Sequence, residues 1–174
     1  MSPRIINSLK RDHVKYRRLL DIFARQIDRV AKVQAPDYDI VEGVIEYFTT
    51  YSLRVHHPEE ELLIAEHHDF HQRIEAFGAQ VRGVLGGGTV MMERDAFTEM
   101  AYDFTDRERR HMSFEDMHLF LAARRHLTAE DWRELEDQIA AEPDFGRRAT
   151  RRYAILRREI LTWEKQNLDG DAAP

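Results

Sequence analysis

Two histidine–glutamate pairs at a spacing of four residues are candidates for metal binding. His56 precedes Glu60, and His111 precedes Glu115 at the same spacing. Residues four apart lie on one face of a helix, so each pair presents an imidazole nitrogen beside a carboxylate oxygen. Iron binds both ligand types. Each pair is therefore a candidate part of a metal site, although a solvent-exposed row of ion pairs would show the same spacing.

Three further histidines occupy helical positions that could serve a metal. His13 lies between Leu9 and Tyr16 on an apolar stripe, so we expect its side chain to point into the core. His67 and His71 form a His-x-x-x-His pair, whose two imidazoles can reach one ion. A hydrogen-bonded core histidine or an exposed histidine-rich helix would explain each of these alone.

The combination favours metal binding, because a buried set of charges is costly unless a cation compensates for it. The candidate ligands are His13, His56, Glu60, His67, His71, His111 and Glu115. The chain has no cysteine, so thiolate-bound zinc and ordinary iron–sulfur clusters are excluded. Seven nitrogen and oxygen donors are too many for one tetrahedral zinc and suit two iron ions bridged by carboxylates.

A third pair, His57 and Glu61, follows one residue later. It is either a second ligand pair or part of a surface charge run, and we leave it out of the candidate site. Glu108-x-x-His111 and Glu115-x-x-His118 match the Glu-x-x-His signature of ferritin-like proteins. That signature belongs on two different helices, whereas here both copies lie on one, so ferritin-like chemistry is not expected.

Helical periodicity dominates the chain, and strand-like alternation is missing. We expect helices over residues 3–32, 39–85 with a kink at Pro58, 91–125, 128–141 and 147–166, with Gly86–Gly88 as a clear break. Thr128 and Asp131 resemble a capping box at the fourth of these helices. The sequence thus predicts an all-α fold within one ordinary domain of 174 residues.

Bulk properties limit the partners. The net charge is −6, which argues against nucleic acid. No apolar run approaches the ~18 residues that span a bilayer, and the N-terminus lacks the apolar stretch of a secretory signal. We therefore expect a cytoplasmic protein without membrane contact.

The order of these motifs resembles that of hemerythrin and the bacterial hemerythrin-like HHE cation-binding proteins. The matching motifs are His13, His56-His57-Pro58-Glu59-Glu60, His67-x-x-x-His71 and His111-Met112-x-x-Glu115. The resemblance covers residues 9–135 well and the C-terminal helices loosely. It implies an up-down four-helix bundle over residues 1–126. The helical pattern adds C-terminal helices over 127–167, which we expect to pack on the bundle, and a disordered tail over 168–174.

The resemblance also implies a role for each ligand. His13 would come from the first helix, His56 with a bridging Glu60 from the second, His67 and His71 from the third, and His111 with a bridging Glu115 from the fourth. The iron pair would carry an oxo or hydroxo bridge. It would bind dioxygen or nitric oxide for carriage, storage or sensing. The alternatives are an enzyme that acts on peroxide or nitric oxide, and a module whose metal only stabilises the fold.

The connection between the second and third helices departs from this pattern. Only Glu61–Glu66 separates the ligand pairs, and that segment strongly favours helix. On one continuous helix, Glu60 and His71 would lie about 16 Å apart along the axis and could not share an iron pair. This predicts a domain-swapped homodimer, in which His13, His56 and Glu60 of one chain join the other ligands from its partner. The alternative is a tight turn around Ile64–Glu66 and a monomer.

Overall fold

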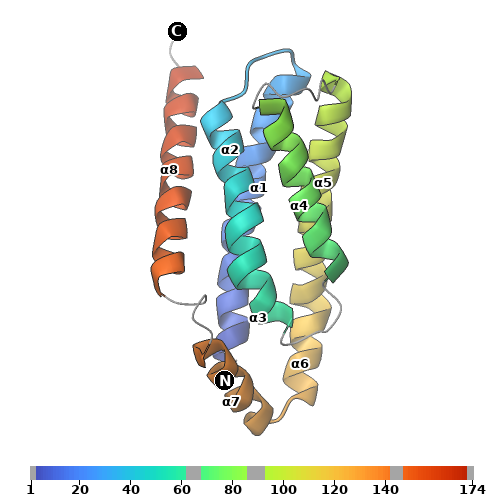
Figure 1. Ribbon diagram of the computed structural model, residues 1–174, viewed down its shortest axis with the longest axis vertical. Coiled ribbons are helices and arrows are strands. Elements are labelled where there is room, and N and C mark those ends of the chain that lie inside the picture. Colours follow the sequence, from blue (N-terminus) through green and yellow to red (C-terminus); the bar gives the residue numbers. More distant parts are fainter. Residues whose placement is uncertain (1–2, 62–67, 86–92, 142–146, 172–174) are drawn as a thin grey trace.

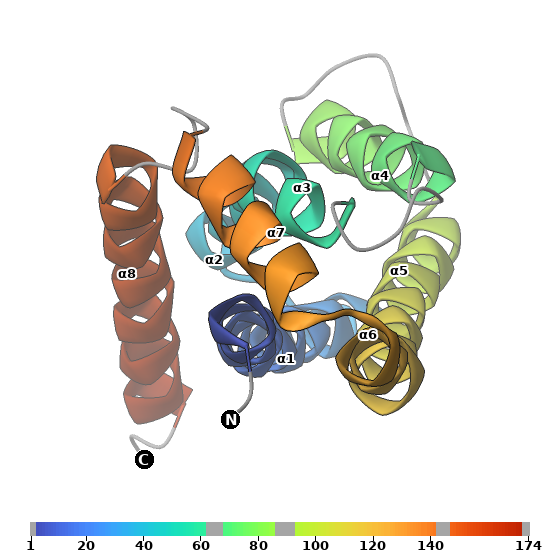
Figure 2. The same ribbon diagram turned by 90° about the horizontal axis from the view of Figure 1, so that it is seen from below.

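Four helical columns lie side by side in the computed structural model, which describes residues 3–61, 68–85, 93–141 and 147–171 (Figures 1 and 2). The columns are α1 (Arg4–Ala31); α2 (Tyr38–Tyr47) with the π-helix η1 (Phe48–His56) and α3 (His57–Glu61); α4 (His68–Leu85); and α5 (Arg94–Phe114) with the π-helix η2 (Glu115–Leu119) and α6 (Phe120–His126). The predicted all-α bundle is confirmed. Within the described ranges, no helix is long and apolar enough to cross a membrane.

Two hydrogen bonds of Asp37 determine where the first two columns meet. The Asp37 side chain caps α2 by accepting a hydrogen bond from the Ile40 backbone N–H, at 3.2 Å. The Asp37 backbone N–H in turn donates to Gln26 Oε1 on α1, at 2.8 Å. These two bonds connect the end of α1 to the start of α2, so the first connection of the bundle is short and well determined.

An aromatic cluster joins three columns in the half of the bundle away from α7. The rings of Phe77 on α4 and Phe104 on α5 stack with their centroids 4.1 Å apart, and Phe23 on α1 meets both rings edge-on. Fully burying a side chain of this size stabilises the folded state by roughly 1.5–3 kcal/mol. The cluster therefore holds α1, α4 and α5 at fixed separations.

The structure corrects the continuous helix predicted across residues 39–85. α3 ends at Glu61 and α4 begins at His68, and α4 runs back along α2 and η1 of the same chain (Figure 1). The physical reason is burial: Ile74, Phe77 and Val81 of α4 are at most 6% exposed. A straight helix would carry these side chains away from the core, a loss that outweighs the local helix propensity of the linker.

The packing of α4 against its own chain therefore favours the alternative prediction, in which the chain turns between the two helices. The turn itself, around 64–66, lies outside the described residues. The predicted exchange of helices between two chains depended on the continuous helix, and it loses that basis here.

Two C-terminal helices add to the bundle. α7 (Ala129–Ala141) crosses the end of the bundle at which α1 begins and α6 ends (Figure 2). Trp132 and Ile139 of α7 pack against a small buried cluster that includes Leu9 and Phe120. The predicted capping box is present, because the Asp131 backbone N–H donates to Thr128 Oγ1 and the Thr128 backbone N–H donates to Asp131 Oδ2. α7 therefore covers the end of the core that contains Leu9 and Phe120.

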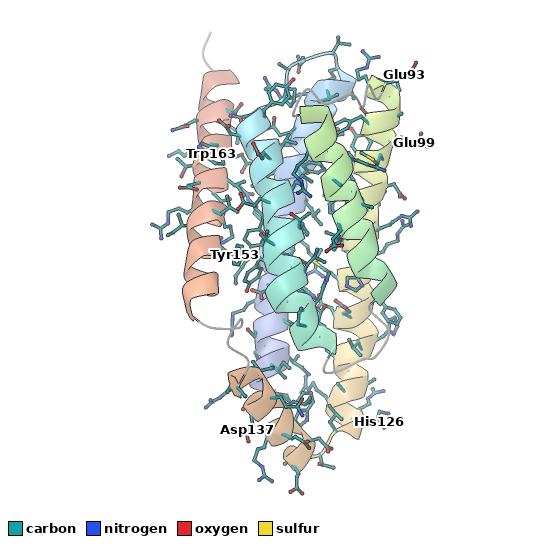
Figure 3. All side chains as sticks on the ribbon, viewed as in Figure 1. Glu93, Glu99, His126, Asp137, Tyr153 and Trp163 are labelled. Atoms are coloured by element: carbon teal, nitrogen blue, oxygen red, sulfur yellow. The ribbon has the colours of Figure 1, made fainter. Side chains whose placement is uncertain are left out.

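α8 (Arg147–Asp171) lies along α2 and ends later than the sequence predicted (Figures 1 and 3). Its approach depends on Gly43 of α2, where an added Cβ would lie 2.9 Å from Ile160 Cγ1 and 3.2 Å from Trp163 Cζ3. Glu164 of α8 is buried and accepts hydrogen bonds from Arg18 and Arg25 of α1. The last helix thus contacts the first two columns directly.

Replacing Gly43 by Leu should push α8 away from α2. Because Ile160 is fully buried, it has little room to move, and such overpacking typically costs about 1–3 kcal/mol of unfolding free energy. Gly43→Ala should have a smaller effect, since it adds only one carbon and improves helix propensity by about 1 kcal/mol. Urea unfolding followed by tryptophan fluorescence would measure both. Equal stability of Gly43→Leu and the parent chain would contradict this close approach.

Candidate metal centre

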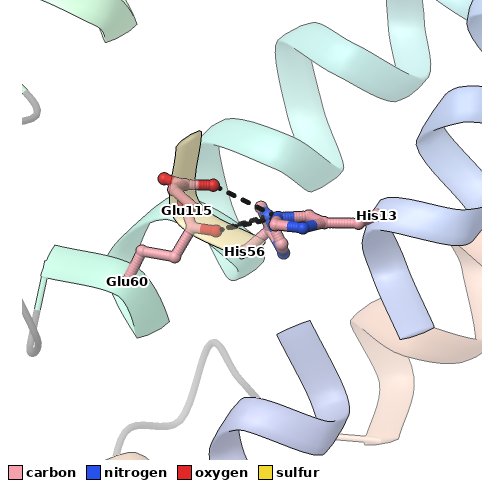
Figure 4. Close-up of side chains that lie close together, drawn as sticks. All are labelled: His13, His56, Glu60 and Glu115. Carbon is pink, nitrogen blue, oxygen red and sulfur yellow. Dashed lines mark hydrogen bonds and ion pairs between the residues drawn. The ribbon is translucent and has the colours of Figure 1, made fainter. Parts of the chain in front are cut away.

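Three of the columns bring two histidines and two glutamates to one buried point (Figure 4). His13 comes from α1, His56 from the end of η1, Glu60 from α3 and Glu115 from the start of η2. All four side chains are at most 1% exposed, and one potential ligand atom from each lies within 4.8 Å of the others. The structure therefore places two imidazoles and two carboxylates where one cation could contact all four.

The distances show how tightly this group is arranged. Glu60 Oε1 lies 2.8 Å from His56 Nε2 and 3.3 Å from His13 Nε2. His13 Nε2 also lies 3.2 Å from Glu115 Oε2. Both histidines thus direct the same ring nitrogen, Nε2, toward the carboxylates, as ligands to a common ion would.

A second group shares a carboxylate with the first. His57, Glu60 and His111 also place ligand atoms within 4.8 Å of one another. Glu115 connects the groups as well, because its Oε1 lies 3.1 Å from His111 Nε2 while its Oε2 faces His13. Two carboxylates that each face both groups are the arrangement that a carboxylate-bridged pair of ions requires.

The π-helical turns η1 and η2 are both located at this centre: η1 ends at His56 and η2 begins at Glu115. A π turn holds more residues than an α turn and occurs often at functional sites. Consecutive residues are then separated by a smaller angle, so His56 and His57 are both 1% exposed. The wider turn also aligns residues five apart, and Ser52 Oγ lies 3.3 Å from His57 Nε2.

Two aspartates lie behind the histidines of the first group. Asp116 Oδ1 is 3.1 Å from His13 Nδ1, and Arg17 donates to the other Asp116 oxygen at 2.6 Å. Asp12 Oδ2 is 3.6 Å from His56 Nδ1 and accepts a hydrogen bond from the Tyr51 hydroxyl at 2.9 Å. A carboxylate at Nδ1 holds the proton on that nitrogen and leaves Nε2 available as a metal ligand.

The charges of the centre are strongly coupled when no ion is present. Burial lowers the pKa of His13, but Glu115 and Glu60 overcome this and raise it to about 9. Burial likewise opposes charge on His56, yet Glu60 and Asp12 raise its pKa to about 10. Burial would raise the pKa of Glu60, but His56 and His13 hold it well below its ordinary value. In the metal-free chain, protonated imidazoles thus supply the positive charge that a bound cation would otherwise supply.

One more carboxyl group is buried near the centre. Glu108, one turn before His111 on α5, is 2% exposed. Burial is the main cause that raises its pKa, His56 opposes the rise, and the charges on Glu115 and Glu60 reinforce it, to about 8. Glu108 therefore holds a proton through most of the neutral range.

The structure brings together five of the seven predicted ligands: His13, His56, Glu60, His111 and Glu115. His67 lies outside the described residues. His71 lies in the first turn of α4, but its side chain is not described, so both remain predictions. The sequence reasoning missed His57, although its position beside His56 and four residues before Glu61 was an available signal.

A comparison with known protein families matches the part of the chain that contains these residues. Residues 4–123 match the model of the family described as hemerythrin HHE cation binding domain. That range contains every residue of the two ligand groups. No match was found among curated proteins or among solved structures.

Metal-free protein should lose stability as the pH rises from about 6.5 to about 10. The folded-state pKa values of His13 and His56 are raised to about 9 and about 10, above the ordinary 6.5. Their stabilisation is fully present below pH 6.5 and is lost as the pH rises through the folded values. Glu108, raised to about 8, acts in the same direction between pH 4.5 and 8. Urea denaturation in the presence of a chelator would measure the trend.

The matched variants are His56→Gln, which should flatten this dependence, and His118→Gln at an exposed position, which should leave it unchanged. Stability that rises toward pH 10 in the parent chain would contradict the charge arrangement.

Proposed function

Because this chain belongs to the hemerythrin HHE cation-binding domain family, we propose that its buried centre binds two non-haem iron ions. The observation that supports this most directly is the sharing of carboxylates. Glu60 belongs to both ligand groups, and the two oxygens of Glu115 face a histidine of each. A single ion in the first group would leave the imidazoles of His57 and His111 without a metal to bind.

The donor set fits iron. The described groups offer imidazole nitrogens and carboxylate oxygens only, a combination typical of non-haem iron, whereas calcium and magnesium prefer oxygen alone. Glu60 Oε2 is buried and accepts no hydrogen bond from the described residues. A buried carboxylate oxygen in that state is costly unless a cation contacts it. The residues therefore fit the group that the family implies.

The proposed ligands divide between two ions. His13 and His56 would bind one, His57 and His111 the other, and Glu60 and Glu115 would bridge them. We also keep His67 and His71 as proposed ligands from the third column. Asp116 and Asp12 would hold the first two imidazoles in place from behind.

The function we propose is reversible binding of a small diatomic ligand, dioxygen or nitric oxide, for carriage, storage or sensing. An iron pair supplies the redox chemistry and an open coordination position for such a ligand. The protein supplies enclosure: the ring of Phe120 stacks on His13, and the ring of Tyr16 meets His56 edge-on. Since the ligand side chains of the first group are at most 1% exposed, only a very small molecule fits beside them.

A specific observation favours a second candidate, reduction of a peroxide. Glu108 is a buried carboxyl with a pKa of about 8, so it carries a proton at neutral pH close to Glu60 and Glu115. Breaking the O–O bond of a peroxide consumes protons, and a positioned acid can deliver them.

Anaerobic loading with ferrous iron would test the function. We expect about two irons per chain, a visible charge-transfer band on exposure to dioxygen or nitric oxide, and loss of that band when the gas is removed. An irreversible change with consumption of hydrogen peroxide would favour the enzyme. A centre that retains zinc and shows no spectral response would contradict the proposal and favour a structural ion.

Replacing Glu60 by Gln should remove most of the bound metal. The amide cannot bridge two cations, and His13 and His56 lose the charge that orients them. Metal analysis after gel filtration would measure the loss. Glu42→Gln, which makes the same charge change on an exposed part of α2, should keep the metal content of the parent chain. Full metal content in Glu60→Gln would contradict the shared carboxylate.

Replacing Asp116 by Asn should weaken metal affinity by about 10–100-fold, because such changes behind a ligand histidine typically have this effect. Competition against a chromogenic chelator would give the affinity. Asp103→Asn is a matched control, since Asp103 pairs with Arg107 as Asp116 pairs with Arg17 but contacts no histidine of the centre. If the two variants weaken affinity equally, Asp116 has no special role.

A further inference from the structure

Four buried tyrosines form an unbroken chain of ring contacts from the candidate metal centre to α8. The ring centroid of Tyr16 lies 4.7 Å from that of His56 and 6.3 Å from that of Tyr51. Tyr51 in turn lies 5.0 Å from Tyr153. Tyr47 lies beside all three tyrosines, at 5.9, 5.1 and 6.2 Å from Tyr16, Tyr51 and Tyr153.

Packing alone does not explain the hydroxyl groups. Phenylalanine would fill the same space, whereas burying a phenol oxygen is costly unless it is hydrogen-bonded. The chain has six tyrosines, and these four are at most 7% exposed. What four phenols can do and four phenyl rings cannot is give up an electron at an accessible potential, by also losing a proton.

Only a phenol with a proton acceptor does this readily, and Tyr51 has one. Its hydroxyl donates to Asp12 Oδ2 at 2.9 Å. The Tyr16 hydroxyl, by contrast, is buried and has no hydrogen-bond partner among the described residues. Asp12 itself lies between Tyr51 and His56.

The fourth tyrosine ring of the chain of contacts, that of Tyr153, belongs to the C-terminal helix. Tyr153 lies on α8 (Figure 3), outside the residues 4–123 that match the family. Its ring contacts Tyr47 and Tyr51 of the second column. The neighbouring Ile155 is 47% exposed, so solvent reaches α8 within two residues of this ring. α8 therefore adds the link that brings the tyrosine chain close to the surface.

We propose that these four tyrosines carry single electrons between the metal centre and the surface at α8, and that Tyr51 is the residue that is oxidised. The proposal rests on the proposed binding of iron and on the second candidate function, reduction of a peroxide. It gives a role to the helix that the family match leaves out.

The oxidant is hydrogen peroxide at the metal centre. Tyr51 loses one electron toward the centre and its phenolic proton to Asp12 Oδ2, which leaves a neutral phenoxyl radical. A hydrogen-atom donor such as ascorbate then returns one electron through Tyr153, and one proton restores the O–H bond. Asp12 releases each proton to the peroxide before it accepts the next. Two such cycles supply the two electrons and two protons that convert one hydrogen peroxide into two waters.

Freeze-quench electron paramagnetic resonance tests the oxidised residue. Iron-loaded protein is mixed with hydrogen peroxide, without a donor, and frozen. We expect a tyrosyl radical signal that ring-deuterated tyrosine narrows and that Tyr51→Phe loses. Tyr102→Phe is the matched control, because Tyr102 also donates to a carboxylate, Asp28, but makes no ring contact with the chain of four. That variant should keep the signal, and all variants should bind iron equally.

A second variant tests the direction of the path. Tyr153→Phe should form the Tyr51 radical in full yield but slow its reduction by ascorbate. An unchanged rate of reduction would overturn the path to α8.

The outcomes separate this inference from the function it rests on. If iron binds and peroxide is consumed, but no tyrosyl radical forms or the signal persists in Tyr51→Phe, the tyrosine path is wrong and the metal centre stands. If no iron binds, the proposed function fails and the tyrosine path fails with it.

Discussion

Two carboxylates buried among imidazoles are the constraint on which the rest of this structure depends. Glu60 and Glu115 are almost fully enclosed, and burial of such charges is strongly unfavourable without compensation. Protonated histidines compensate in the metal-free chain, and a cation can replace those protons. The centre is therefore stable only if α1, η1, α3 and η2 reach the same level of the bundle together. The aromatic cluster in the other half of the core and α7 across the near end hold the helices in that arrangement.

The two π turns and the two aspartates serve this same requirement. The π turns rotate His56, His57 and Glu115 into one space that a regular α-helix would not present to them. Asp12 and Asp116 each come from a different helix than the histidine they support, so the second and the fourth columns are each connected to α1 through the centre. Bound metal would therefore stabilise the packing of the columns as well as the ligands themselves.

Helical periodicity was sufficient to predict the bundle and to select five candidate ligands that the structure brings together. His13, His56 and Glu60 lie on apolar stripes at regular spacing, and that pattern survives in the structure. Helical periodicity did not predict two features of the structure. His57 is buried because η1 is wider than an α-helix, and local sequence carries no clear signal for that change. The return of α4 along α2 depends on burial of Phe77 against Phe23 and Phe104, which are distant in sequence, so the helix-favouring linker gave the wrong expectation.

The central claim is that Glu60 joins two metal ions in one chain. Crystals of iron-loaded protein, measured on both sides of the iron absorption edge, would test it most directly through anomalous scattering. A pair of ions bridged by Glu60 would give two iron peaks per chain, about 3.5–4 Å apart, one beside His13 and His56 and the other beside His57 and His111, with Glu60 between them. A single peak, or iron bound away from Glu60, would contradict it.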